Sequence, residues 1–180
     1  DVSYLFRHYG AGYFSPKSNG LSENSENLNE IGLFLGLGYQ INKRMKLSSY
    51  ADYFRFPGPK YQVIATNTSG WEFLSRLQWE KRHVARGFIQ GKWTRKEDKH
   101  LIQISLDGHY IAIKSWDFHV RAMASNLASE IGYLLLQDVK WDQGKWNVQG
   151  RFAYMNTPSY DTRNYAYEPG VPYSFLLPAY

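Results

Sequence analysis

The chain has 180 residues, of which 43% are hydrophobic and 17% aromatic, with a formal net charge of +5 and no cysteine. Its length fits one domain or a piece of a larger one. The lack of cysteine excludes disulfides and Cys-based metal sites. The basic residues are too scattered to form a nucleic-acid-binding stripe. The mean hydropathy is −0.51, and no window approaches the roughly eighteen uninterrupted apolar residues of a transmembrane helix.

Residues 29–44, NEIGLFLGLGYQINKR, follow a weaker segment at 2–14 and show the clearest pattern. Every second position from Ile31 to Ile41 is apolar, and the positions between are small or polar except for Phe34. Since successive strand residues point to opposite faces, this predicts a strand of about a dozen residues, where about five or six are usual. The same alternation predicts further strands at 71–79, 85–93, 100–110, 115–125 and 145–155, and it is weaker at 45–55 and 130–141. No segment shows helical spacing, so the chain is predicted to be all-β.

The links between these predicted strands differ in length. Long polar links occupy 15–27, 56–70 and 156–172, whereas 42–44, 81–83 and 142–145 are short. Outer-membrane barrels combine short periplasmic turns with longer extracellular loops. We therefore expect the long links to share one exposed side, with Lys43 and Arg82 at the opposite end.

Aromatic residues lie at the ends of the apolar stripes, as Trp71 and Trp79 do. Amphipathic rings favour the membrane–water interface, and about ten tilted residues cross the hydrocarbon, so the pattern predicts an antiparallel up-and-down transmembrane β-barrel. The alternative is a soluble sheet in which these Trp residues cap an ordinary core. Gly32, Gly36 and Gly38 are expected to leave room in the lumen for other side chains.

The alternation divides the strand residues into two predicted sets. Those predicted to face lipid are Ile31, Leu33, Leu35, Leu37, Trp71, Phe73, Leu77, Trp79, Ile102, Ile104, Leu106, Trp116, Phe118 and Val120. Those predicted to face the lumen are Glu30, Glu72, Arg76, Arg86, Lys92, Asp107, His109, Asp117, His119, Arg121 and Arg151.

The final stretch, YDTRNYAYEPGVPYSFLLPAY, resembles a segment of a large group of outer-membrane β-barrel proteins from Bacteroidota-type bacteria. These are usually described as helix-hairpin-helix domain-containing proteins, because such repeats precede the barrel. The motifs NEIG (29–32), ADYFRFP (51–57) and GYLLLQD (132–138) also resemble that family's barrel. The matching positions in the final stretch are Tyr160, Asp161, Arg163, Tyr165, Tyr167, Glu168, Tyr173, Ser174 and Phe175.

This resemblance implies a location in the outer membrane of a Gram-negative bacterium. Residues 1–180 would form part of a single barrel domain with about ten visible strands, and further strands are expected outside this sequence because family members continue past the PAY segment. The helix-hairpin-helix part has no counterpart in these residues, so no DNA contact is carried over. The shared motifs are structural and name no chemistry.

Residues with catalytic or metal-binding chemistry are few. If the hairpin over 100–125 is centred near residue 113, Asp107 faces His119 and His109 faces Asp117. Two His and two carboxylates form a zinc-ligand set, but the same residues form opposite-charge cross-strand pairs in a polar lumen. We predict the pairs, and no metal or other cofactor.

A Ser–His–Asp hydrolase site can be assembled from Ser105, His119 and Asp107. These residues stand at the alternate positions that are predicted to face the lumen, whereas a membrane phospholipase needs its triad on the lipid side. The prediction is therefore a non-enzymatic outer-membrane barrel, either porin-like or a component of a larger envelope complex for transport, secretion or assembly. Its expected partners are outer-membrane lipid, lipopolysaccharide and other envelope proteins, and no nucleic acid. Two alternatives remain open: a soluble all-β barrel that binds an apolar ligand, and an outer-membrane hydrolase.

Overall fold

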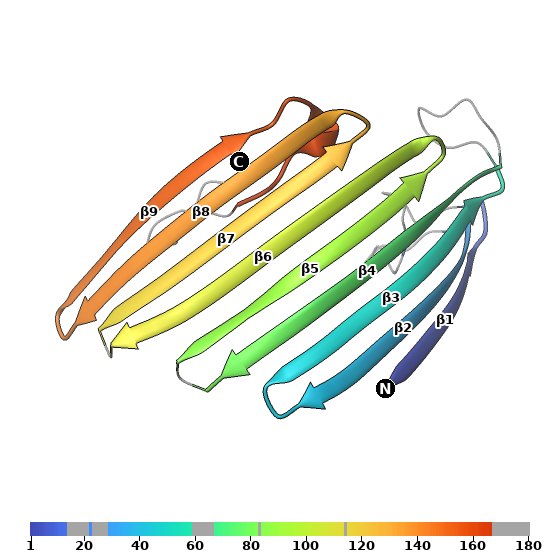
Figure 1. The fold of residues 1–180 in the computed structure, drawn as a ribbon. Helices are drawn as coiled ribbons and strands as arrows, with labels where there is room; N and C mark the ends of the chain where they lie inside the picture. Colours follow the sequence, from blue (N-terminus) through green and yellow to red (C-terminus); the bar gives the residue numbers. More distant parts are fainter. Residues whose placement is uncertain (14–21, 23–28, 59–66, 83, 114, 167–180) are drawn as a thin grey trace.

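The computed structural model describes residues 1–13, 22, 29–58, 67–82, 84–113 and 115–166 of the chain. They form one sheet of nine antiparallel strands in which each strand pairs with its neighbours in the sequence (Figure 1). The strands are β1 (Val2–Tyr9), β2 (Glu30–Asn42), β3 (Met45–Phe56), β4 (Thr68–Lys81), β5 (Ala85–Lys96), β6 (Lys99–Ile113), β7 (Trp116–Leu127), β8 (Glu130–Gln143) and β9 (Trp146–Asn156). The all-β, up-and-down prediction is confirmed, with nine strands described where about ten were expected.

The sheet is open. Strands β1 and β9 lie at opposite edges (Figure 1), and each pairs with one neighbour only within the described ranges. Strands β2 to β9 contain between 11 and 15 residues, longer than the five or six residues usual in soluble sheets. This is the architecture of part of an up-and-down barrel. Helix is limited in the described chain to the 3-10 turn η1 (Tyr160–Thr162), and no described helix is long and apolar enough to cross a membrane.

Long and short links leave opposite ends of the sheet. The links 10–29 and 57–67 leave one end, the loop end, together with the turns 97–98 and 128–129 and the segment after β9. The turns 43–44, 82–84, 114–115 and 144–145 leave the other, the turn end. Most of the predicted loops at 17–27 and 60–68 lies outside the described residues, so their exposure stays a prediction.

The two faces of the sheet differ in composition and shape. On the outer face, the described strands carry no Asp or Glu, and Lys or Arg occurs only at strand ends, at Arg55, Lys81 and Arg95. The inner face carries the charged residues. It is the concave face, because a concavity of about 750 Å³ on it is lined by residues of every strand from β2 to β9.

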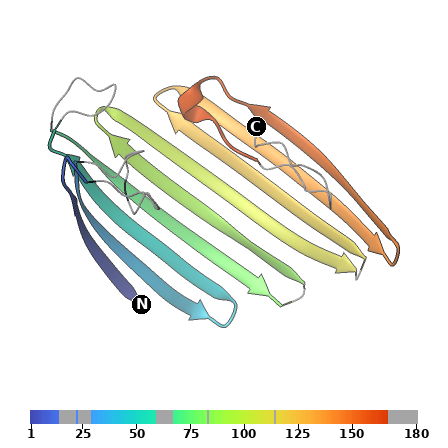
Figure 2. The same ribbon diagram turned by 180° about the vertical axis from the view of Figure 1, so that it is seen from behind.

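The chain after β9 turns back over the ends of β7 and β8 (Figures 1 and 2). Thr162 is fully buried there, and Ser125 Oγ of β7 donates a hydrogen bond of 2.8 Å to Asn164 Oδ1. A Cβ atom at Gly132 of β8 would collide with the carbonyl oxygen of Thr162, so the close approach depends on glycine. The described part of the predicted loop, 160–166, therefore lies at the loop end with Thr162, Asn164 and Ala166 buried and Tyr160 and Tyr165 exposed. Its exposure to the outside of a cell stays a prediction.

Candidate functional site

Alternate strand residues fall on the two faces of the sheet, and the strand registers divide them as the sequence pattern did. On the outer face lie Ile31, Leu33, Leu35, Leu37, Trp71, Phe73, Leu77, Trp79, Ile102, Ile104, Leu106, Trp116, Phe118 and Val120. On the inner face lie Glu30, Glu72, Arg76, Arg86, Lys92, Asp107, His109, Asp117, His119, Arg121 and Arg151. Which medium each face meets stays a prediction.

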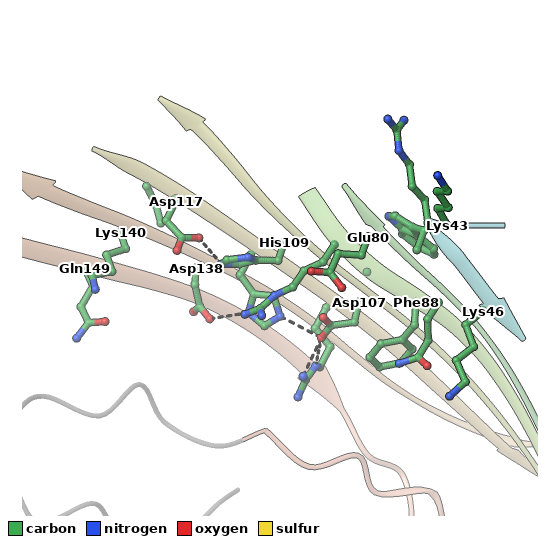
Figure 3. Close-up of a pocket in the computed structure, with 18 of the residues that line it drawn as sticks. Lys43, Lys46, Glu80, Phe88, Asp107, His109, Asp117, Asp138, Lys140 and Gln149 are labelled. Atoms are coloured by element: carbon green, nitrogen blue, oxygen red, sulfur yellow. Dashed lines mark hydrogen bonds and ion pairs between the residues drawn. The ribbon is translucent and has the colours of Figure 1, made fainter. Parts of the chain in front are cut away.

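A row of charged side chains crosses β6 to β9 near the turn end (Figure 3). His119 stands between two carboxylates, with Nε2 3.0 Å from Asp107 Oδ2 and Nδ1 3.1 Å from Asp138 Oδ2. Arg121 Nε donates to Asp107 Oδ2 at 2.7 Å, and Arg151 Nη2 donates to Asp138 Oδ2 at 2.7 Å. Each carboxylate of this row is therefore matched by an arginine and shares the histidine.

The β6–β7 hairpin has a different register from the predicted one. Asp107 lies directly opposite Arg121, and His109 opposite His119, so the ladder is centred one residue further along the chain than predicted. The predicted side-chain pairs form as diagonals instead, with His109 Nε2 2.6 Å from Asp117 Oδ1. Diagonal neighbours in a sheet are within reach of long side chains. The expected contacts are thus present, and the expected register was wrong.

The contacts around His119 bear on the metal-site hypothesis. Zinc ligands surround one point at about 2.0–2.2 Å, whereas Asp107 and Asp138 approach opposite ring nitrogens of His119. Across the described residues, no group of three or more His, Asp or Glu side chains could hold a metal ion. Asp107, His109, Asp117 and His119 interact with one another in pairs.

The predicted hydrolase residues are also placed by the sheet. Ser105 lies on the inner face of β6, opposite Gln90 and Met123, and is nearly buried. A nucleophilic serine needs a histidine nitrogen within about 2.6–3.2 Å to accept its proton. Both ring nitrogens of His119 already face carboxylates, so this geometry offers Ser105 no such acceptor.

A second charged cluster lies near the loop end and is buried. Arg7 Nε donates to Glu30 Oε1 at 2.6 Å, and its Nη1 and Nη2 donate to the two oxygens of Asp52 at 2.8 and 2.9 Å. The exposed fractions of Arg7, Glu30 and Asp52 are 4%, 0% and 6%, and Ser22 Oγ donates a further bond to Glu30. A Cβ atom at Gly32 would touch the Arg7 guanidinium. Gly32 therefore leaves the room in the interior that the sequence pattern indicated.

Glu72 of β4 lies opposite Asp52 of β3 and so extends this buried cluster onto the next strand. Tyr50 donates to Glu72 Oε1 at 2.5 Å, Thr94 Oγ1 donates to Oε2 at 3.2 Å, and Lys92 Nζ lies 2.9 Å from Oε2. Buried polar groups are tolerated where they have hydrogen-bond partners. The described contacts satisfy both carboxylate oxygens of Glu72.

The wall of the concavity formed by β2 to β5 at the turn end is different. It carries four cations, Lys43, Arg44, Lys46 and Arg86, and one carboxylate, Glu80. Arg86 lies opposite Glu80 in the register, but neither it nor any of the other three cations forms an ion pair within the described residues. We call these four cations the basic wall.

The residues that resemble the Bacteroidota barrel motifs lie in structural positions. The Arg163 guanidinium stacks 3.2 Å from the ring centroid of Tyr160 and 5.2 Å from that of Tyr165, and Asp161 pairs with Lys99 at 2.7 Å. The other matching positions of the final stretch, Tyr167, Glu168, Tyr173, Ser174 and Phe175, lie outside the described residues.

Arg7 was not among the residues predicted from the sequence, and Asp52 and Asp138 appeared there only within motifs. The three residues stand in the three weaker periodic segments, and all have the parity of the other inner residues. Their alternate positions along each strand were the signal that could have identified them as inner-face residues. Their grouping depends on which strands are neighbours, which alternation within one strand does not specify.

No protein-family model, no curated protein and no solved structure matches the chain, so the resemblance to the Bacteroidota barrels stays a prediction.

Proposed function

We propose that this chain is part of an integral outer-membrane β-barrel whose outer face meets lipid and whose inner face lines the interior, and that it works as a channel or as a component of a larger envelope assembly. The observation that carries the proposal is the inverted burial of the two faces. Leu35 and Ile104 of the outer face are 49% and 54% exposed, whereas Glu30 and Glu72 of the inner face are 0% and 6% exposed. Water-soluble proteins bury aliphatic side chains and expose carboxylates.

The composition of the outer face supports a lipid contact over a local docking patch. A contiguous apolar surface much larger than a few hundred Å² is rare on a soluble monomer, and here the apolar character extends across nine strands. Two of the hydroxyl groups on this face, Ser49 Oγ and Ser75 Oγ, lie 2.9 Å apart and hydrogen-bond each other. Polar groups in hydrocarbon need such internal partners.

Aromatic side chains on the outer face gather in two bands. Toward the loop end, Trp71 stacks with Phe73 at 5.8 Å and Phe73 with Trp93 at 5.5 Å. Toward the turn end, Trp116 lies 6.4 Å from Trp141, and Trp79 stands near the same end of β4. The span from Trp71 to Trp79 is about 26 Å along the strand at about 3.3 Å per residue, or about 20 Å in height at the roughly 40° tilt of such barrels, which approaches their apolar band of about 25 Å.

The two alternative functions fit these contacts less well. A soluble barrel that holds an apolar ligand needs an apolar interior, and the concave face here carries ion pairs and carboxylates. A hydrolase needs a hydrogen bond between the serine and a histidine nitrogen. Both ring nitrogens of His119 already contact carboxylates. We therefore retain neither as a second proposal.

Fractionation tests the membrane location. Outer membranes separated by density should contain the protein, alkaline carbonate should leave it in the pellet, and only detergent should dissolve it, because its apolar face has no soluble cover. Recovery in the soluble fraction or in the carbonate extract would contradict the proposal.

Cysteine labelling tests the orientation, since the chain has no natural cysteine. Asn67→Cys at the loop end should react with an impermeant thiol reagent on whole cells, whereas Lys43→Cys and Arg82→Cys at the turn end should react only after lysis. Labelling of the turn-end cysteines on intact cells, with none at position 67, would reverse the orientation.

A further inference from the structure

We propose that the basic wall binds the phosphate group of a small water-soluble solute in the concavity, with Lys46 and Arg86 as its principal contacts. This goes beyond a barrel role, because it assigns a ligand class to one part of the inner face. It rests on the charge and geometry of that face, and on neither the membrane location nor the family resemblance.

The first reason is a difference in ion pairing on one concave surface. The three carboxylates that line the concavity on the β6 to β9 side each have an arginine or histidine nitrogen within 3.0 Å: Arg121 for Asp107, His109 for Asp117 and Arg151 for Asp138. The cations of the basic wall have no such partner in the described chain. Four cations against the single carboxylate of Glu80 leave the wall with a formal excess of positive charge. A concave surface of one sign concentrates oppositely charged solutes.

The second reason is the placement of Lys46 and Arg86. Gln78 of β4 lies opposite both Lys46 of β3 and Phe88 of β5, and Arg86 stands one inner position beyond Phe88. Two strand spacings separate β3 from β5, about 10 Å, so the two long side chains can close on one anion above Gln78. Figure 3 shows Lys46 and Phe88 together on one side of the concavity, away from Asp117 and Gln149.

The third reason concerns the kind of anion. A wall with several cations and one carboxylate favours a multiply charged group over a single carboxylate, because each additional charge adds a Coulomb attraction. Phosphate also accepts several hydrogen bonds from Arg and Lys at once. The Phe88 ring, which lies 4.4 Å from the Arg76 guanidinium, provides a flat apolar surface beside the anion. Lipid phosphates are disfavoured, since acyl chains would meet mainly charged and amide side chains in this concavity.

Isothermal titration of the folded protein with inorganic pyrophosphate tests the site. We expect saturable binding near one equivalent that weakens as salt rises. The double variant Lys46→Gln/Arg86→Gln should lose at least about tenfold in affinity, as expected for two charge-assisted hydrogen bonds. Lys81→Gln is the matched control, because Lys81 stands at the turn end of β4 but on the outer face. The pyrophosphate affinity of this variant should match that of the wild type. Absence of binding, or equal loss in the control, would overturn the proposal.

A variant in the opposite direction separates binding from folding damage. Glu80 is the one carboxylate of the wall and has no ion pair in the described chain, so Glu80→Gln should tighten pyrophosphate binding about threefold to tenfold by removing a repulsion. Unchanged or weaker binding would count against the site. In a final arm, micelles doped with phosphatidylglycerol should leave pyrophosphate affinity unchanged, and competition by that lipid would assign the wall to headgroups and overturn the choice of a soluble solute.

Discussion

The outer and inner faces of the sheet are built from alternate residues of the same strands, yet they follow opposite rules. On the outer face, apolar side chains stay exposed, as Leu35 does at 49%. On the inner face, charges are buried and paired, as Arg7 is with Glu30 and Asp52. The difference teaches that the pleat of the strands alone places residues in two environments. The inner face is then stabilised by ion pairs and hydrogen bonds, whereas the outer face depends on apolar contacts.

The inner face also changes along its length. At the loop end, the Arg7 cluster is almost free of solvent contact. At the turn end, the side chains of His119 and Asp138 are 25% and 23% exposed, and the basic wall is open. The free-energy cost of an unpaired charge grows with burial. Substitutions of charged residues are therefore expected to destabilise the protein more at the loop end than at the turn end.

The largest expected effect is in the buried cluster. Arg7→Met should destabilise the protein by about 3–5 kcal/mol, because it leaves the carboxylates of Glu30 and Asp52 buried without their cation. Urea unfolding in detergent, followed by tryptophan fluorescence, measures it. Lys99→Met is the control, since its ion pair with Asp161 is largely exposed and should contribute less than about 1 kcal/mol. Equal losses in the two variants would show that the cluster is not shielded from solvent.

Arginine on the outer face should have the next largest effect. Leu35→Arg or Ile104→Arg near the middle of the apolar band should cost about 2–4 kcal/mol if that face meets lipid, as measured by unfolding from lipid vesicles. The inner-face control is Gln149→Arg, which lies in the concavity and should be mild. Gly36→Arg is unsuitable, because Ser3 and Phe34 occupy the space beside Gly36. Equal damage at inner and outer positions would remove the distinction between the faces.

A smaller effect is expected at the partly exposed end of the inner face. Asp138→Asn removes the carboxylate shared by Arg151 and His119 and should cost about 1–2 kcal/mol, at the low end for charged hydrogen bonds because water reaches the site. Asp142→Asn is the comparison, since the one ion pair that Asp142 forms within the described residues, with Lys140, is 4.0 Å long and exposed. The same unfolding measurement should find it close to wild type, and a reversed order would contradict the assignment of Asp138 to the row.

The smallest effect concerns the histidines. His119→Ala leaves Asp107 with Arg121 and Asp138 with Arg151, so the loss should be about 0.2–1 kcal/mol, as for cross-strand pairs. Elemental analysis of purified wild type and His109→Ala should find no stoichiometric zinc in either. One zinc per wild-type chain that disappears in the variant would replace the ion-pair interpretation of the inner face with a metal site.

The alternation of residues in the sequence determined where the strands run and the face on which each strand residue lies, because a pleated strand sends successive side chains to opposite sides. Leu33 and Glu72 could be placed on their faces from parity alone. The sequence also located the Asp107–His119 and His109–Asp117 contacts, but with the wrong register. Moving the hairpin centre by one residue changes each cross-strand partner by two positions, so every residue stays on its predicted face.

Only the tertiary structure decided which inner residues meet. Arg7 reaches Asp52 across β2, which depends on the small Gly32 between them and on the neighbouring order of three strands. The packing of Asn164 against Ser125 likewise follows from distances between strands. The same holds for Lys46, which forms no ion pair in the described chain although it lines the same concavity as the paired Arg121. A one-dimensional pattern holds no such distances, because sheet curvature and strand order set which side chains converge.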